Sequence, residues 1–183
     1  MLFRSVVPLV GTPEEAARAA GACRYPPDGH RSWGPVRTSA ALGATAAERN
    51  ERVLCIVMVE TRDGVENLDA ICAVPGVDGV YVGPRDLGLS HGLAPGPELE
   101  AVIERIVATC RKHGVPAGIH ARSGDSARAY AQAGCLFASV ATDRELLARV
   151  SRAELAAALG RDPAHEPVPA DGLLRAAVSY IAP

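Results

Sequence analysis

VLCIVMVETRDGVENLDAICAVPGVDGVYVGPRD, residues 53–86, contains the strand–helix–strand pattern that decides the fold. Its first seven residues, Val53–Val59, form a nearly continuous apolar run, which is typical of a strand covered on both faces. A helix is predicted to begin at Asp63-Gly64 and to end at Pro75-Gly76, and the apolar run 77–82 predicts the next strand. A strand, a helix and a second strand in this order predict two parallel strands joined by a crossover.

The same alternation continues on both sides of this stretch. Residues 6–10 predict an upstream strand, and Thr12-Pro13-Glu14-Glu15 has the capping pattern of a helix start with proline in the first turn. Downstream, strands are predicted at 115–119 and 136–140, and helices at 97–113, 126–133 and 142–159. Five strands alternating with helices predict an α/β fold with a parallel sheet and right-handed crossovers.

A doubly wound sheet would fit the same order of elements. However, no GxGxxG motif follows the first strand and no GxxxxGK[ST] motif occurs in the chain. Since these motifs carry the phosphate-binding loops of the common nucleotide-binding folds, a nucleotide site is not expected.

Composition and charge indicate which kinds of partner and which cell compartment to expect. The 183 residues have a formal net charge of −2, which gives no reason to expect nucleic acid or an anionic membrane as a partner. No apolar run reaches the roughly 18 residues of a membrane span, and the first residues lack the pattern of a signal peptide. The five cysteines are widely spaced without a CxxC motif, which favours small core residues in a reducing compartment. We therefore expect a cytoplasmic protein.

Three polar residues end consecutive predicted strands. Glu60 follows Val53–Val59, Asp86 lies just past the strand at 77–82, and His120 ends the strand at 115–119. In parallel α/β folds, ligands bind at the carboxyl ends of the strands, so Glu60 and Asp86 are expected to face one site. Two carboxylates at one site repel each other unless a cation lies between them, and Mg²⁺ accepts one or two carboxylates while keeping positions for substrate oxygens. The simpler alternatives are a helix-capping Asp86 and an ordinary carboxylate at the end of a strand.

Four segments of the chain resemble the HpcH/HpaI aldolase family. They are RYPPDG at 24–29, VETR at 59–62, GVYVGPRDL at 79–87 and GCLFASV at 134–140. They occur in the family's order and at its spacing, and the similarity extends over residues 6–150. The resemblance implies a (β/α)₈ TIM-barrel type of fold and a class II aldolase, a carbon–carbon lyase.

The resemblance also implies a chemistry and a set of residues. A divalent cation, Mg²⁺ first and Mn²⁺ or Co²⁺ as alternatives, would be held by Glu60 and Asp86 and would chelate pyruvate or another 2-oxo acid. The enolate of that acid adds to an aldehyde, or is released when the carbon–carbon bond is cleaved. Gly83 and Pro84 are expected to bring backbone close to the substrate carboxylate. Arg85 and Arg31 are further candidates for binding the substrate.

The predicted strands number five, whereas the family's barrel has eight and typically needs about 250 residues. The five match the family's last five, so the family's catalytic base and its Arg have no counterpart by motif. His120 is a speculative replacement base, and a histidine tolerated at the end of a strand is the simpler reading. We expect an incomplete barrel over residues 1–160, then a linker and a short helix over 161–183.

These differences leave several interpretations of function open. The chain could be an aldolase impaired by the missing strands, from a truncated gene model or a genuinely short protein. It could be a non-catalytic remnant that binds metal. It could also be a CoA-ester lyase of the citrate lyase β-subunit type. The open edges of such a sheet favour association, so a homo-oligomer is expected.

Overall fold

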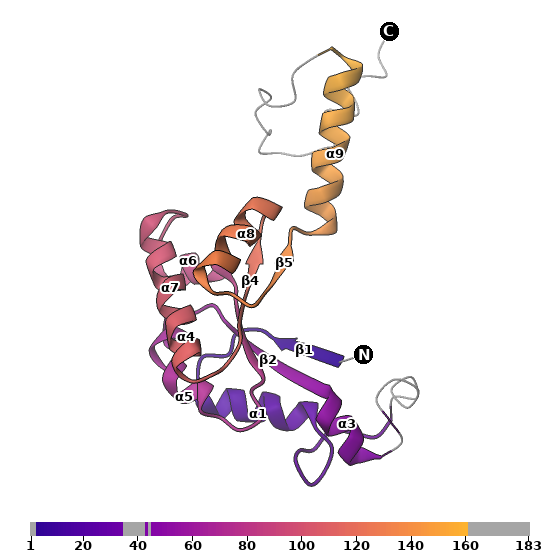
Figure 1. Ribbon diagram of the computed structural model, residues 1–183, viewed down its shortest axis with the longest axis vertical. Coiled ribbons are helices and arrows are strands. Elements are labelled where there is room, and N and C mark those ends of the chain that lie inside the picture. The colour runs from indigo at the N-terminus through magenta and orange to yellow at the C-terminus, as the bar shows by residue number, and fades with distance from the viewer. Residues whose placement is uncertain (1–2, 35–42, 44, 161–183) are drawn as a thin grey trace. The chain divides into compact units, whose positions relative to one another are not determined.

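Five parallel strands form the sheet of the computed structural model, which describes residues 3–34, 43 and 45–160 (Figure 1). The strands lie side by side in chain order, β1-β2-β3-β4-β5, and every neighbouring pair is parallel. The sheet curls like part of a barrel. The predicted order and direction of the strands are therefore confirmed. Their bounds are β1 Phe3–Val7, β2 Val53–Val59, β3 Gly79–Val82, β4 Ala117–Ala121 and β5 Phe137–Val140.

Helices follow or precede each strand. Several begin at a residue whose side chain accepts a hydrogen bond from the first helical turn, as a capping residue should. Thr12 accepts from the backbone N–H of Glu15, and Thr142 forms a full capping box with Glu145, so both predicted helix starts are confirmed. The helices are α1 Pro13–Cys23, α3 Ala46–Arg52, α4 Arg62–Glu66, α5 Leu68–Cys72, α6 Pro84–His91, α7 Pro97–Lys112, α8 Gly124–Ala133 and α9 Asp143–Ala158.

The first strand lies earlier in the chain than its apolar pattern predicts. The predicted range was 6–10, whereas Phe3–Val7 pairs with β2. The reason is the backbone at Leu9, whose φ of 57° is left-handed and cannot continue a strand. Its N–H is thereby turned to the side chain of Glu60 instead of to a neighbouring strand.

Two further elements differ from the sequence prediction. The single helix expected after β2 is divided into α4 and α5 at Asn67, which has φ −91° and ψ 6° and whose side chain donates to the carbonyl of Gly11. The residues after Gly83, expected as a loop, form helix α6 instead. This helix starts with Pro84 in its first turn and ends at Gly92, which has φ 67°. Proline at the start and a left-handed glycine at the end are ordinary boundaries of a helix.

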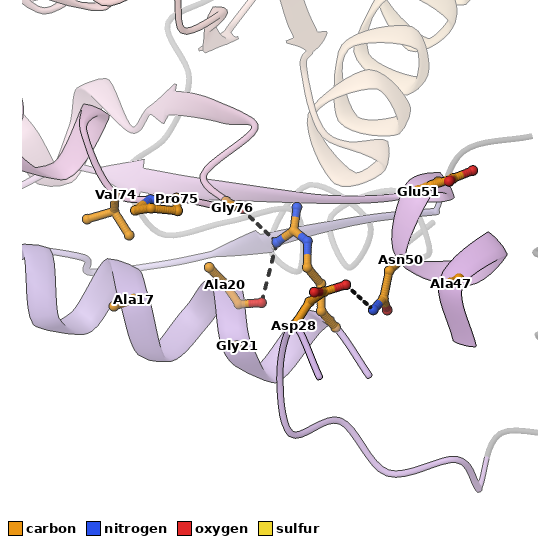
Figure 2. A pocket seen from close by; sticks show the side chains of 11 residues that line it. Ala17, Ala20, Gly21, Asp28, Ala47, Asn50, Glu51, Val74, Pro75 and Gly76 are labelled. Carbon is orange, nitrogen blue, oxygen red and sulfur yellow. Dashed lines mark hydrogen bonds between the residues drawn. The ribbon is translucent and has the colours of Figure 1, made fainter. Parts of the chain in front are cut away.

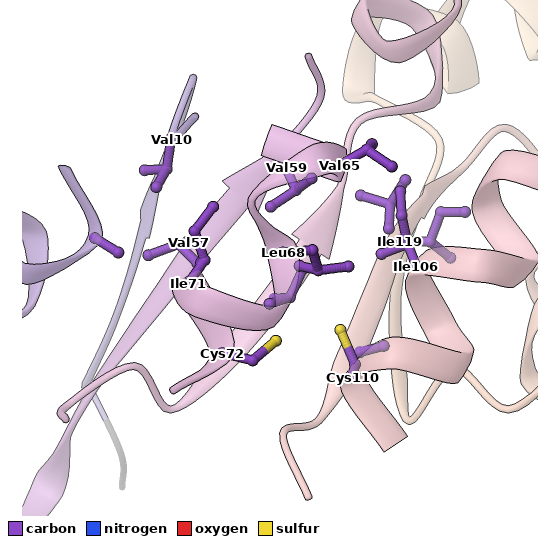
Figure 3. Close-up of a cluster of buried hydrophobic side chains, with 14 of the residues drawn as sticks. Val10, Val57, Val59, Val65, Leu68, Ile71, Cys72, Ile106, Cys110 and Ile119 are labelled. Atoms are coloured by element: carbon purple, nitrogen blue, oxygen red, sulfur yellow. The ribbon is translucent and has the colours of Figure 1, made fainter. Parts of the chain in front are cut away.

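The hydrophobic core lies between the sheet and the helices on one of its faces (Figure 3). Alternate residues of β2 and β3 contribute Val57, Val59, Val80 and Val82, all fully buried. The helices contribute the apolar stripes of α5 and α7, whose buried members include Leu68, Ile71, Ile106 and Cys110. All five cysteines are buried free thiols.

The opposite face of the sheet is less covered. Val6 of β1 is 47% exposed, and the alternate residues Met58, Tyr81 and His120 are only partly buried. Since successive side chains of a strand point to opposite faces, these residues share the face turned away from the core.

The chain divides into two compact units, Met1–Val140 and Ala141–Pro183. The first contains the sheet, and the described part of the second is dominated by α9. The linker and short helix predicted over 161–183 lie outside the described residues. Within the described ranges, none of the helices is both long and apolar enough to cross a membrane.

Two leucines of α6 provide a matched test of this packing. Leu87 is fully buried, whereas Leu89 is 72% exposed on the same helix. We expect Leu87→Ala to lower the free energy of unfolding by about 2–5 kcal/mol, because it leaves a cavity in the core. Leu89→Ala should change it by about 0.5 kcal/mol or less. Urea unfolding followed by circular dichroism measures both, and equal effects would contradict the assigned faces of α6.

Candidate functional site

The carboxyl edge of the sheet is arranged in rows across the strands. Val59, Val82 and Ile119 stand level with one another in the ladders, and all three point into the core. The next residue of each strand therefore points to the opposite face. These residues are Glu60, Gly83 and His120, and Ser139 of β5 stands level with His120. The parallel register thus places two of the three predicted strand-end residues, Glu60 and His120, in one row, whereas Asp86 lies three residues beyond Gly83 in α6.

Glu60 is a buried carboxylate held by the backbone. Only 3% of its surface is exposed, and its Oε1 accepts a hydrogen bond of 2.9 Å from the N–H of Leu9. Within the part of the chain that the structure describes, no lysine, arginine or histidine forms an ion pair with it. A buried carboxylate is costly to ionise unless positive charge lies nearby.

Asp86 lies in the first turn of α6, and its carboxylate is close enough to Glu60 to affect the pKa of that residue. Burial raises the pKa of the Glu60 carboxyl, and the hydrogen bond from Leu9 partly opposes that rise. The negative charge of Asp86 and a hydrogen bond between the two carboxyl groups raise the pKa of Glu60 further. The structure therefore brings Glu60 and Asp86 together at the end of β2 and the start of α6.

The segment after β3 lies against the Glu60 carboxylate. A Cβ atom at Gly83 would overlap the carboxylate of Glu60, so only glycine fits here without displacing it. Pro84 opens α6, and the first helical hydrogen bond runs from the N–H of Leu87 to the carbonyl of Gly83. The backbone N–H groups of Arg85 and Asp86 precede that bond and so belong to the free end of the helix. The side chain of Arg85 is exposed.

His120 is the third polar group of this edge, and it is joined to two others. Its Nδ1 lies 2.7 Å from Oγ of Ser139, which in turn forms a short hydrogen bond with the hydroxyl of Tyr81. Ser139 and Tyr81 were not singled out in the sequence. The available signal was their spacing, because Tyr81 precedes Gly83 by two residues and so shares its face of β3.

Arg31 lies elsewhere. Its backbone N–H donates to the carbonyl of Arg24, and its guanidinium lies 5.4 Å from the ring centroid of Tyr25. Arg24 pairs with Asp78, which comes just before β3, at 2.8 Å. This group therefore lies at the amino edge of the sheet, and the structure does not bring Arg31 to Glu60.

The amino edge also holds a cavity of about 580 Å³, bounded by α1, α3 and the turn before β3 (Figure 2). The guanidinium of Arg24 reaches across it to the carbonyl of Gly76 at 2.8 Å. Asp78 binds the same guanidinium and also accepts the N–H of Cys55 at 2.7 Å. The charged groups of Arg24 and Asp78 thus satisfy each other and join α1 to the sheet.

The described residues contain no group of three or more His, Cys, Asp or Glu side chains that could surround a metal ion. Glu60 and Asp86 are therefore a pair. A pair of carboxylates suits an ion such as Mg²⁺, which keeps several waters and takes its other ligands from the substrate.

Comparisons with known proteins identify the family of this chain. The model of the HpcH/HpaI aldolase/citrate lyase family matches residues 4–149. The chain is 40% identical over 147 residues to the 5-keto-4-deoxy-D-glucarate aldolase of Salmonella gallinarum. The matched region covers 77% of this chain and 57% of that aldolase. The chain thus spans a little over half the length of such relatives.

Solved structures show the same fold. A HpcH/HpaI aldolase/citrate lyase family protein from Burkholderia cenocepacia is 36% identical with a TM-score of 0.76, over 85% of this chain and 64% of that one. The citrate synthase SbnG is 25% identical with a TM-score of 0.73, over 86% and 63% of the two chains. With the family model matched over residues 4–149 and a relative 40% identical over 147 residues, this chain belongs to the HpcH/HpaI aldolase/citrate lyase family.

Proposed function

We propose that the chain carries the cation-binding part of an aldolase site, at which Glu60 and Asp86 hold a divalent metal ion and a 2-oxo acid such as pyruvate binds. The observation that carries the proposal is the buried carboxylate of Glu60. It faces a second carboxylate and has no cationic side chain beside it among the described residues. Such a pair favours a bound cation, because the ion offsets both negative charges. Mg²⁺ is the first candidate by ligand type.

The surrounding residues fit this ion. Glycine at position 83 lets the Glu60 carboxylate lie against the backbone at the end of β3, because a Cβ atom there would overlap Oε2. The Leu9 N–H fixes one carboxylate oxygen and leaves Oε2 on the side of Gly83. When bound, a divalent ion would supply a Lewis acid that stabilises negative charge on the keto oxygen of the substrate.

The backbone of Arg85 and Asp86 provides the proposed contact for the substrate carboxylate. Their N–H groups lie at the N-terminus of α6, where the helix dipole favours negative charge. The adjoining Gly83-Pro84 segment has no large side chain that would keep a ligand from the backbone. Aldol cleavage or formation between a 2-oxo acid and an aldehyde is the reaction that this set of groups supports. The aldolase relatives are consistent with that choice.

The stability of the metal-free protein tests the charge on Glu60. Because the pKa of Glu60 is raised in the folded state, its ionisation opposes folding at pH values above the ordinary carboxyl pKa of about 4.3. We expect Glu60→Gln to raise the melting temperature at pH 7–8 without metal, since the amide can still accept the Leu9 N–H. The gain should vanish as the pH falls below the ordinary value, where the glutamate is neutral in both states. A gain that persists at low pH, or a loss at neutral pH, would contradict the buried charge.

Binding of Mg²⁺ together with oxalate, a planar mimic of the pyruvate enolate, tests the site itself. At a hundredfold excess over the dissociation constant, we expect stabilisation of about 2.7 kcal/mol by thermal unfolding. Glu60→Gln and Asp86→Asn should each abolish this gain, because a neutral amide cannot offset the ion's charge. Asp125→Asn is the matched control, since Asp125 is an exposed carboxylate paired with Arg128 on α8.

A third variant tests the site without changing its charge. Gly83→Ala should also abolish the stabilisation, because the added methyl group would displace the Glu60 carboxylate. Release of pyruvate from a 4-hydroxy-2-oxo acid by the same samples then measures turnover. Wild-type protein that is folded but gains no stability from Mg²⁺ and oxalate would overturn the proposed function.

A further inference from the structure

We propose that His120 is the catalytic acid and base of this site, and that Ser139 and Tyr81 position its imidazole. The proposal rests on the proposed function, because it requires a 2-oxo acid at Glu60 and Asp86. It rests on one arrangement on the less covered face of the sheet. There the His120 ring is linked to the Ser139 hydroxyl, and that hydroxyl to the phenol of Tyr81.

The parallel register places His120 on the row of Glu60. Val59, Val82 and Ile119 are level, so the next residues, Glu60, Gly83 and His120, are level as well. With neighbouring strands about 4.8 Å apart, the backbones of Glu60 and His120 lie roughly 10 Å from each other. The position between them is Gly83, which has no side chain. The Glu60 carboxylate lies over Gly83, where a Cβ atom would overlap it. The row therefore places a carboxylate and an imidazole on the same face of the sheet, two strands apart.

The row below holds the imidazole's support. Met58, Tyr81, Gly118 and Phe137 are level across the same four strands. Gly118 lets the rings of Tyr81 and Phe137 stack with centroids 6.0 Å apart, since a Cβ atom there would overlap the Phe137 ring. The Tyr81 hydroxyl consequently reaches Ser139 in the row above.

This support fixes which ring nitrogen is available. The hydrogen bond of one imidazole nitrogen sets the protonation of the other. In the arrangement that we propose, Nδ1–H of His120 donates to Oγ of Ser139, and the hydroxyls of Ser139 and Tyr81 share the next hydrogen bond. The second nitrogen, Nε2, then carries a lone pair. The ring is only partly buried, so Nε2 remains accessible to a ligand.

The proposed step is proton transfer at C3 of pyruvate. The C3–H bond breaks, its proton goes to Nε2, and its electron pair forms the C2=C3 double bond of the enolate. The negative charge then lies on the C2 oxygen. In the reverse direction, Nε2–H returns a proton to C3, which completes aldol cleavage by converting the enolate into pyruvate. No redox partner or further reactant is needed.

Exchange of the pyruvate methyl protons in D₂O with Mg²⁺, followed by proton NMR, tests this role without an aldehyde. His120→Gln should slow the exchange by about 100- to 10,000-fold, the usual contribution of a general acid or base. It should retain the stabilisation by Mg²⁺ and oxalate, because Glu60 and Asp86 are untouched. His113→Gln is the matched control, since His113 pairs with Asp69 on the helical layer, and it should leave the exchange rate unchanged.

The positioning role of Ser139 has its own readout. Ser139→Ala should slow exchange, and Ser139→Thr should restore it because threonine keeps the hydroxyl. Nitrogen-15 NMR of the metal-free protein should show the His120 ring with its proton on Nδ1 in wild type, and on Nε2 in Ser139→Ala. Tyr81→Phe should act in the direction of Ser139→Ala. An unchanged tautomer in Ser139→Ala would overturn the positioning role.

The outcomes separate the two proposals. Exchange that continues at the wild-type rate in His120→Gln overturns the role of His120. Wild-type protein that binds Mg²⁺ and oxalate but exchanges no methyl protons overturns it as well, while the cation site stands. Folded protein that binds neither overturns the proposed function, and the role of His120 with it.

Discussion

The burial of the Glu60 carboxylate is the constraint on which the carboxyl edge of the sheet depends. A charge at this depth needs hydrogen bonds or a compensating cation. Two segments of the chain are fitted to this carboxylate. Leu9 takes a left-handed backbone conformation and directs its N–H at Oε1. On the other side, glycine at position 83 is the residue that leaves room for Oε2. The two segments come from different parts of the chain, yet both are fitted to the same side chain.

The burial of Glu60 explains why the sequence predicts the fold correctly but misplaces the bounds of the first strand. Val53–Val59 was predicted with its observed limits, because a continuous apolar run of seven residues has few alternatives. The pattern at 6–10 is also apolar, but Leu9 does not continue the strand, because its N–H donates to the side chain of Glu60. A hydrogen bond to a side chain 51 residues away is invisible to a local pattern. Helix α6 was missed because Gly83-Pro84 has the composition of a turn, although proline also begins helices.

The site was partly predictable for a related reason. Glu60 and Asp86 follow consecutive strands, and the order of strands in a parallel sheet makes such residues neighbours. Ser139 and Tyr81 depend instead on the register between β3, β4 and β5, which no single strand reveals. Arg31 shows the limit of resemblance. It lies two residues after the segment 24–29 that resembles the family, but its contacts with Arg24 and Tyr25 place it at the amino edge.

The pairing of Asp78 at that amino edge has a consequence for the opposite edge. One carboxylate oxygen of Asp78 binds both the guanidinium of Arg24 and the N–H of Cys55, and so joins the beginnings of β2 and β3. A slip of one residue between these strands would turn Gly83 to the wrong face and put Val82 or Pro84 beside Glu60. The ion pair at the amino edge thus helps to fix the register of β2 against β3, on which the site about 17 Å further along the strands depends. Substitution of Asp78 would then alter the geometry around Glu60 and Gly83 rather than the packing of the core.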